Sequence, residues 1–140
     1  MLRYTLIHPE ILATLGTAGH GSKVLIADGN YPFTTGSNPA AKRVYLNLTT
    51  GIPKVTDVLA TLVTAIPIEA AEVMVPDSGP EPPIFAEFRQ ILPKEIALRP
   101  LGRFGFYDAA KGADVALVIA TGEQRIYANI LLTIGVVKPA

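Results

Sequence analysis

The apolar positions of the chain form two kinds of pattern, short continuous runs and helically spaced stripes. Short runs at 24–27, 72–75 (Glu72 followed by three apolar residues) and 115–120 are bounded by Gly, Pro or polar residues and predict buried strands. Residues 43–48 alternate between apolar and polar side chains, and a last apolar stretch occupies 126–134. The pattern therefore predicts five strands.

Helical spacing marks the segments between these runs. Pro9 and Glu10 suit the first turn of a helix over 9–15. The clearest amphipathic stripe begins after Pro53, with apolar residues at 55, 58, 59, 62, 63 and 66. Residues 84–92 predict another helix that Pro93 ends, and 103–110 predict a further one weakened by Gly105. Strands that alternate with amphipathic helices predict a single three-layer α/β/α domain over residues 1–140, with a mostly parallel sheet.

Composition adds an expectation about assembly. Hydrophobic residues make up 49% of the 140 residues and the mean hydropathy is +0.36, yet no apolar run approaches the ~20 residues of a membrane span. We expect apolar surface covered by other copies of the chain, that is, a homo-oligomer.

The net charge of zero without a basic cluster argues against nucleic-acid binding, and the lack of cysteine excludes disulfides and thiol chemistry. No secretion signal is visible at 1–10, so a cytoplasmic location is expected.

Candidate chemistry concentrates in residues 19–30, GHGSKVLIADGN. Asp28 falls at the carboxyl end of the strand 24–27, the edge where open α/β sheets bind ligands. His20 lies in the glycine turn before that strand. As an acid/base candidate and as an ordinary turn histidine that bonds backbone, His20 is about evenly balanced.

Three other interpretations of this stretch are weak. A phosphate loop requires glycines between a strand and the following helix, whereas here a helix precedes the glycines and a strand follows. A triad of Ser22, His20 and Asp28 lacks a Gly-x-Ser-x-Gly elbow. A metal site from His8, Glu10, His20 and Asp28 matches no ligand spacing, and neither a metal nor a cofactor is expected.

Other polar and aromatic residues admit two roles each. Arg103 is either a solvated surface charge or a ligand-binding group, and Tyr127 and Asn129 are either strand-edge polar residues or two side chains pointing one way from a strand. Tyr31 and Phe33 lie in the loop 29–39, where they either pack beneath the loop or line a pocket or subunit contact.

Several segments, taken in order, resemble one family. They are His8-Pro9-Glu10, Gly19-His20-Gly21, Ile26 to Pro32 (IADGNYP), Arg103 to Tyr107 (RFGFY), Thr121-Gly122-Glu123, Tyr127 to Leu132 (YANILL) and Gly135-Val136. Together they span nearly the whole chain and are similar to the ribose pyranase and fucose mutarotase family.

The resemblance implies an isomerase that interconverts the anomers, or the pyranose and furanose rings, of a free monosaccharide. It implies that His20 is the catalytic acid/base. It also implies that Asp28, Tyr127, Asn129 and the backbone of Ala128 bind the sugar. The 103–107 stretch resembles the fucose branch rather than the ribose branch, so a fucose-like hexose is favoured, with Arg103 placed to hold an oxygen on which charge develops.

The length of the strand 23–28 determines how far apart His20 and Asp28 lie in one chain. As an extended strand, 23–28 spans about 17 Å at ~3.3 Å per residue, so His20 and Asp28 fall at opposite ends of it. To share one pocket, the turn must fold back, the strand must be shorter than expected, or two subunits must meet. Of these we expect a pocket at or near a subunit interface. The alternative function is a non-catalytic monosaccharide-binding protein on the same scaffold.

Overall fold

The structure is a computed structural model that describes residues 1–140. Its elements are, in order, α1 (Pro9–Thr17), β1 (Lys23–Ala27), β2 (Lys42–Tyr45), α2 (Val55–Leu62), β3 (Ile68–Met74), α3 (Ile84–Ile91), β4 (Leu98–Leu101), α4 (Arg103–Ala110), β5 (Val115–Ala120) and β6 (Ile130–Ile134). None of the four helices is long and apolar enough to cross a membrane.

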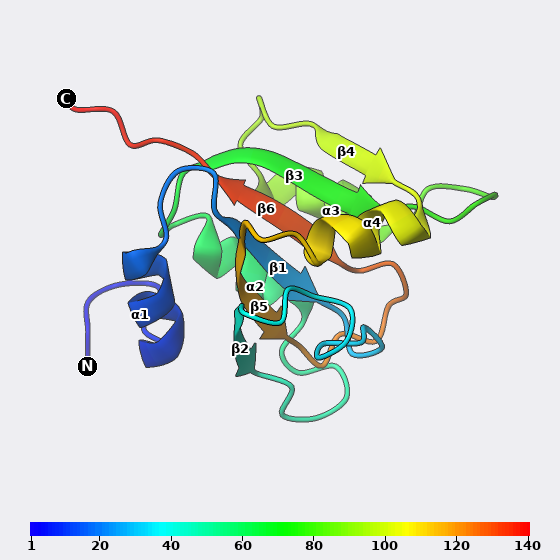
Figure 1. The fold of residues 1–140 in the computed structure, drawn as a ribbon, viewed down its shortest axis with the longest axis horizontal. Helices are drawn as coiled ribbons and strands as arrows, with labels where there is room; N and C mark the ends of the chain where they lie inside the picture. Colours follow the sequence, from blue (N-terminus) through cyan, green and yellow to red (C-terminus); the bar gives the residue numbers. More distant parts are fainter.

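All six strands join one sheet in the order β2-β5-β1-β6-β3-β4 (Figure 1). β2, β5 and β1 pair in parallel, as do β3 and β4, while β6 lies antiparallel between β1 and β3. The expected mostly parallel α/β architecture is therefore confirmed, with β6 as the exception. Because β6 runs the other way, its amino end meets the carboxyl ends of its neighbours.

The two faces of the sheet are covered unequally. On one face the core contains side chains of α1, α2 and α3, including the fully buried Leu59 and Phe88, packed on alternate sheet residues such as Ile26. On the other face α4 contributes Phe106, which packs with Leu25 and its neighbours beneath the 28–41 loop. In Figure 1, α4 crosses in front of the sheet, and α2 and α3 lie behind it.

Several element boundaries differ from the sequence-based expectation. β2 ends at Tyr45 rather than 48, β3 begins four residues earlier than expected, and β6 begins at Ile130 rather than 126. The short strand β4 was not predicted. It lies at the edge of the sheet, where Pro100 is tolerated because one side of an edge strand needs no ladder hydrogen bond.

Candidate functional site

Asp28 and Asn129 lock together two segments at the carboxyl edge of the sheet. Asp28 follows the last residue of β1 and Asn129 precedes the first residue of β6. The backbone N–H of Asp28 donates to Asn129 Oδ1 at 2.7 Å, and Asn129 Nδ2 donates back to Asp28 Oδ2 at 3.1 Å. Both side chains are buried, with 3% of each residue exposed. This hydrogen-bonded pair of Asp28 and Asn129, called the lock below, fixes the orientation of two polar groups that a ligand can reach.

Three hydrogen bonds use most of the acceptor capacity of the Asp28 carboxylate. Oδ1 accepts from the backbone N–H of Asn30 at 2.9 Å, and Oδ2 accepts from the backbone N–H of Ala128 at 3.3 Å as well as from Asn129. Burial raises the pKa of Asp28, and its effect outweighs these hydrogen bonds, which act in the opposite direction. A carboxylate offers about four acceptor sites, so roughly one remains for a ligand hydroxyl.

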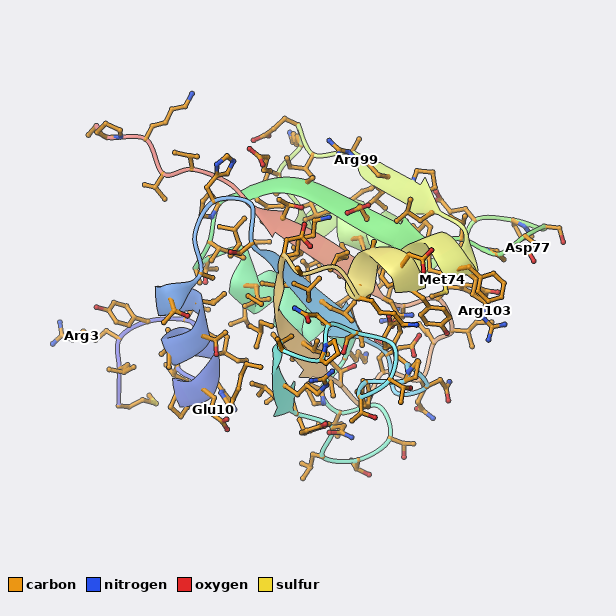
Figure 2. The ribbon with its side chains drawn as sticks, in the orientation of Figure 1. Arg3, Glu10, Met74, Asp77, Arg99 and Arg103 are labelled. Carbon is orange, nitrogen blue, oxygen red and sulfur yellow. The ribbon has the colours of Figure 1, made fainter.

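A cavity of about 290 Å³ opens above this lock. Its lining includes Asp28, Asn129, Tyr127 and Arg103 with Met74. Figure 2 shows Met74 and Arg103 at the same end of the molecule, far from Arg3 and Glu10. The cavity therefore gathers the predicted Asp28, Arg103, Tyr127 and Asn129 from β1, α4 and the segment before β6.

Arg103 lies at the mouth of this cavity. It is the first residue of α4, is exposed, and its guanidinium carbon lies 6.0 Å from the ring centroid of Tyr107. No carboxylate pairs with it, so its guanidinium donors face solvent and the cavity. Such a group can hold a ligand oxygen that carries negative charge.

The loop aromatics divide between the two roles left open by the sequence. Tyr31 lines the cavity, but its hydroxyl donates to the carbonyl of Gly36 at 2.6 Å and its ring contacts Phe106 and Tyr107. Phe33 packs against Tyr45, with ring centroids 6.2 Å apart, and does not line this cavity. Tyr31 thus forms part of the wall and also holds the loop in place, whereas the interactions of Phe33 are structural.

The segment before β6 has an unusual backbone. Tyr127 has φ of 59°, in the left-handed region that non-glycine residues rarely adopt. The expectation that Tyr127 and Asn129 belong to a strand is therefore wrong, because the chain turns at Tyr127 before β6 begins. This turn brings the N–H of Ala128 to Asp28 and leaves the Tyr127 side chain half-buried at the cavity.

An ion pair between the buried Glu123 and the partly exposed Arg125 anchors the same segment. The Glu123 carboxylate accepts from Nε and Nη2 of Arg125 at 3.0 and 2.9 Å and from the backbone N–H of Val55 at 3.2 Å. Arg125 also pairs with Glu87 on α3. Burial would raise the pKa of Glu123, but the hydrogen bonds and charge of Arg125 outweigh it and lower that pKa. Sequence reasoning gave these residues no role.

A second, polar cleft of about 410 Å³ adjoins the cavity. Asn30 lines both, and the cleft continues past Asn47, Thr49 and Gln124. Gly122 lies at its base beside the backbone carbonyl of Thr49, where a Cβ atom would approach to 2.2 Å. Only a glycine fits this close contact between the two loops.

His20 lies at the opposite edge of the sheet. It precedes β1, in a turn where the N–H of Gly21 donates to the carbonyl of Ile134 at the end of β6. Its side chain is 56% exposed, and its Nε2 lies 2.9 Å from Oε1 of Glu69. Within one chain, His20 and Asp28 therefore lie at opposite ends of β1. This separation agrees with the one expected from the strand length.

The weaker sequence hypotheses find no geometric support. Ser22 Oγ accepts from the backbone N–H of Gly19 at 3.3 Å and shapes the turn, far along β1 from Asp28. His8 caps α1 by accepting from the N–H of Ile11. No group of three or more His, Asp or Glu side chains is arranged to hold a metal ion.

Comparison with known proteins places this geometry in a family. The sequence pattern of the RbsD / FucU transport protein family matches residues 1–137. A fucose mutarotase from Bos taurus is 31% identical over 144 residues, which cover 96% of this chain and 92% of the relative. A D-ribose pyranase from Variovorax paradoxus (strain S110) is 33% identical over 141 residues, covering 97% and 98%.

The fold is shared with a solved relative. The crystal structure of the fucose mutarotase from Streptococcus pneumoniae in complex with L-fucose matches with a TM-score of 0.81 at 28% identity, covering 99% of this chain and 100% of that one. The similarity thus extends over the whole sheet and both edges described above.

Proposed function

The chain belongs to the RbsD / FucU family, and from that premise we propose that it is a monosaccharide mutarotase, one domain over residues 1–140. Relatives named fucose mutarotase and D-ribose pyranase, each at about 30% identity over nearly the full chain, support an enzyme that interconverts sugar forms. The observation that carries the proposal is the cavity at the carboxyl edge, where a buried carboxylate, an amide and an unpaired guanidinium converge.

We propose that this cavity binds the sugar hydroxyls. Asp28 retains about one acceptor site, and Asn129 retains one Nδ2 hydrogen after the other is given to Asp28. Tyr127 offers a phenol at the cavity, and the backbone of Ala128, whose N–H donates to Asp28, is the remaining proposed sugar contact. Arg103 supplies charge-assisted donors for an oxygen on which negative charge develops.

In the proposed reaction, a base takes the proton of the anomeric hydroxyl while an acid protonates the ring oxygen. The C1–O5 bond breaks, the open-chain aldehyde turns about C1–C2, and the hydroxyl adds back to either face with the protons returned. No electrons are exchanged with a cofactor. Histidine can both accept and donate a proton through its two ring nitrogens, so His20 suits this proton transfer.

His20 reaches such a cavity only from a second copy of the chain. The strand β1 separates the two edges by five residues, or about 17 Å. We therefore propose a homo-oligomer in which the His20 turn of one subunit completes the carboxyl-edge cavity of the next. Large apolar side chains on the surface, among them Phe104 and Ile126 beside the cavity, supply area for such a contact.

A fucose-like hexose is the proposed substrate. The stretch 103–107, which begins α4 at the cavity, is the part of the sequence that resembles the fucose branch. Relatives of both names match at similar identity, so ribose is the natural competitor in a substrate test. The cytoplasmic location expected from the sequence stays a prediction.

The deciding experiment is saturation-transfer NMR, which measures anomer exchange at equilibrium, with L-fucose, D-ribose, D-galactose and D-glucose. We expect exchange of L-fucose above the uncatalysed rate, reduced about 10²- to 10⁴-fold in a His20→Gln variant. His8→Gln, at the only other histidine, is the matched control. A protein that binds these sugars without accelerating exchange would instead be the non-catalytic binding protein.

A further inference from the structure

The His20 ring has one partner in the chain, the carboxylate of Glu69, 49 residues away in sequence. We propose that Glu69 is a positioning residue that fixes the tautomer and direction of the His20 imidazole. The inference rests on the proposed acid/base role of His20. Glu69 itself lies near the amino end of β3 and does not line the cavity of its own chain.

The backbone places Glu69 irregularly in its strand. Opposite β6, Ile68 pairs with Ile134 and Ala70 pairs with Thr133, so Glu69 is the extra residue of a β-bulge. A bulge changes the direction of a side chain that regular pleating would otherwise fix, and bulges are frequent beside active sites. Here the bulge lets the Glu69 side chain reach past the end of β6 toward the His20 turn.

The last residues of β6 and the glycines beside them hold the two sides of this contact. Gly21, with φ of 86°, donates its N–H to Ile134, so the turn is pinned to the end of β6. On the other side, Gly135 donates to the carbonyl of Pro67, and a Cβ on Gly135 would lie 3.4 Å from that of Glu69. Both partners are therefore attached to the same strand end.

The pair contributes little to the stability of the fold. The two side chains are 56% and 50% exposed, and exposed ion pairs stabilise proteins weakly because water screens them. Its effect on the imidazole is specific, however. A carboxylate only accepts, so the Nε2 facing Glu69 carries a proton and Nδ1 is left free to take a proton from a substrate hydroxyl.

The test compares Glu69→Ala, Glu69→Gln and the control Glu72→Gln. Glu72 lies three residues further along β3, where it pairs with Lys23 and not with His20. We expect Glu69→Ala to lower kcat for anomer exchange about 10- to 100-fold with an unchanged Kd for the sugar, as for other groups that orient a functional histidine. Glu69→Gln keeps an acceptor oxygen and recovers part of kcat, and Glu72→Gln matches wild type.

Nitrogen-15 NMR of the histidine rings gives a readout that a structural role would not move. The chain has two histidines, so His8→Gln assigns the signals. We expect neutral His20 to populate the Nε2–H form in wild type and a mixture of tautomers in Glu69→Ala. Unchanged tautomers and kcat in Glu69→Ala, with exchange lost in His20→Gln, would overturn this proposal alone. Full exchange in His20→Gln would instead refute the catalytic role of His20.

Discussion

The two edges of the sheet differ in how completely one chain builds them. At the carboxyl edge, Asp28 and Asn129 are buried and hold each other through two hydrogen bonds, with Arg103 and Tyr127 around them. At the amino edge, His20 stands on an exposed turn with Glu69 as its only side-chain partner. One edge therefore holds rigid, buried polar groups and the other presents an exposed histidine.

In the homo-oligomer proposed above, one subunit would bind the sugar and its neighbour would transfer the proton. Buried polar groups are costly when they have no partner, and the hydrogen bonds between Asp28 and Asn129 satisfy most of the polar atoms at the carboxyl edge and make it rigid. An exposed histidine has no such requirement and can meet a partner surface. Binding and proton transfer should therefore respond separately to mutation.

The variant with the largest expected effect should change the rate of anomer exchange without changing the affinity for the sugar. His20→Gln should lower the exchange rate about 10²- to 10⁴-fold while leaving sugar affinity nearly unchanged. Asp28→Asn keeps the side-chain shape but removes the charge, and should weaken sugar binding roughly 10-fold or more, since hydrogen bonds to charged groups contribute about 1.5–3 kcal/mol. Exchange NMR gives the rates and isothermal titration gives Kd. Equal loss of affinity in both variants would place His20 among the binding groups instead.

Mixing the two variants tests whether one site uses two subunits. Neither His20→Gln nor Asp28→Asn alone has an intact site, but co-expressed chains combine the intact His20 of one with the intact Asp28 of another. In a randomly mixed closed oligomer about a quarter of the sites regain both groups. Exchange assays of the co-expressed protein should show a corresponding recovery. Complete inactivity of a confirmed mixed oligomer would contradict the interface site.

A smaller effect is expected at the ion pair that anchors the segment before β6. Arg125→Ala removes two guanidinium bonds from the buried Glu123 and should lower the free energy of unfolding by about 2 kcal/mol near neutral pH. Because pairing lowers the Glu123 pKa, this stabilisation is present above its unfolded value of 4.5 and is lost as the pH falls through the folded pKa. Urea unfolding at several pH values measures it.

The matched control is Arg89→Ala, which breaks an ion pair with Glu81 on the exposed side of α3. This pair lies in solvent, so we expect no measurable loss of stability. If both variants lost the same stability, burial of Glu123 would not be the reason for the Arg125 effect.

Local pattern predicted most of the sheet and all four helices, because apolar runs and helical stripes follow from burial of one face. It missed β4, whose four residues include Pro100 and whose edge position leaves them partly exposed. It also extended β6 back to 126, because a sequence does not reveal that Tyr127 adopts a left-handed backbone. Short edge strands and strained turns depend on their tertiary surroundings.

The site was predicted in part for a similar reason. The rule that ligands bind at the carboxyl ends of strands correctly placed Asp28 beside the other polar groups, and strand length correctly separated it from His20. Glu69 and Glu123 were missed because their contacts depend on a β-bulge and on a loop meeting the start of α2. Neither contact leaves a regular spacing in the sequence.

The smallest expected effect concerns the pH dependence of the lock itself. Burial raises the pKa of Asp28, so its contribution to stability is greatest below the unfolded value of 3.8 and declines as the pH rises through the folded pKa. The stability of wild type relative to the non-titrating Asp28→Asn should therefore fall as the pH rises above 3.8, opposite in sign to the trend at Glu123. Urea unfolding of both proteins across this range measures the difference. If the difference instead rose with pH, the hydrogen bonds from Asn30, Ala128 and Asn129 would affect the pKa of Asp28 more than burial does. Folding would then favour the charged carboxylate.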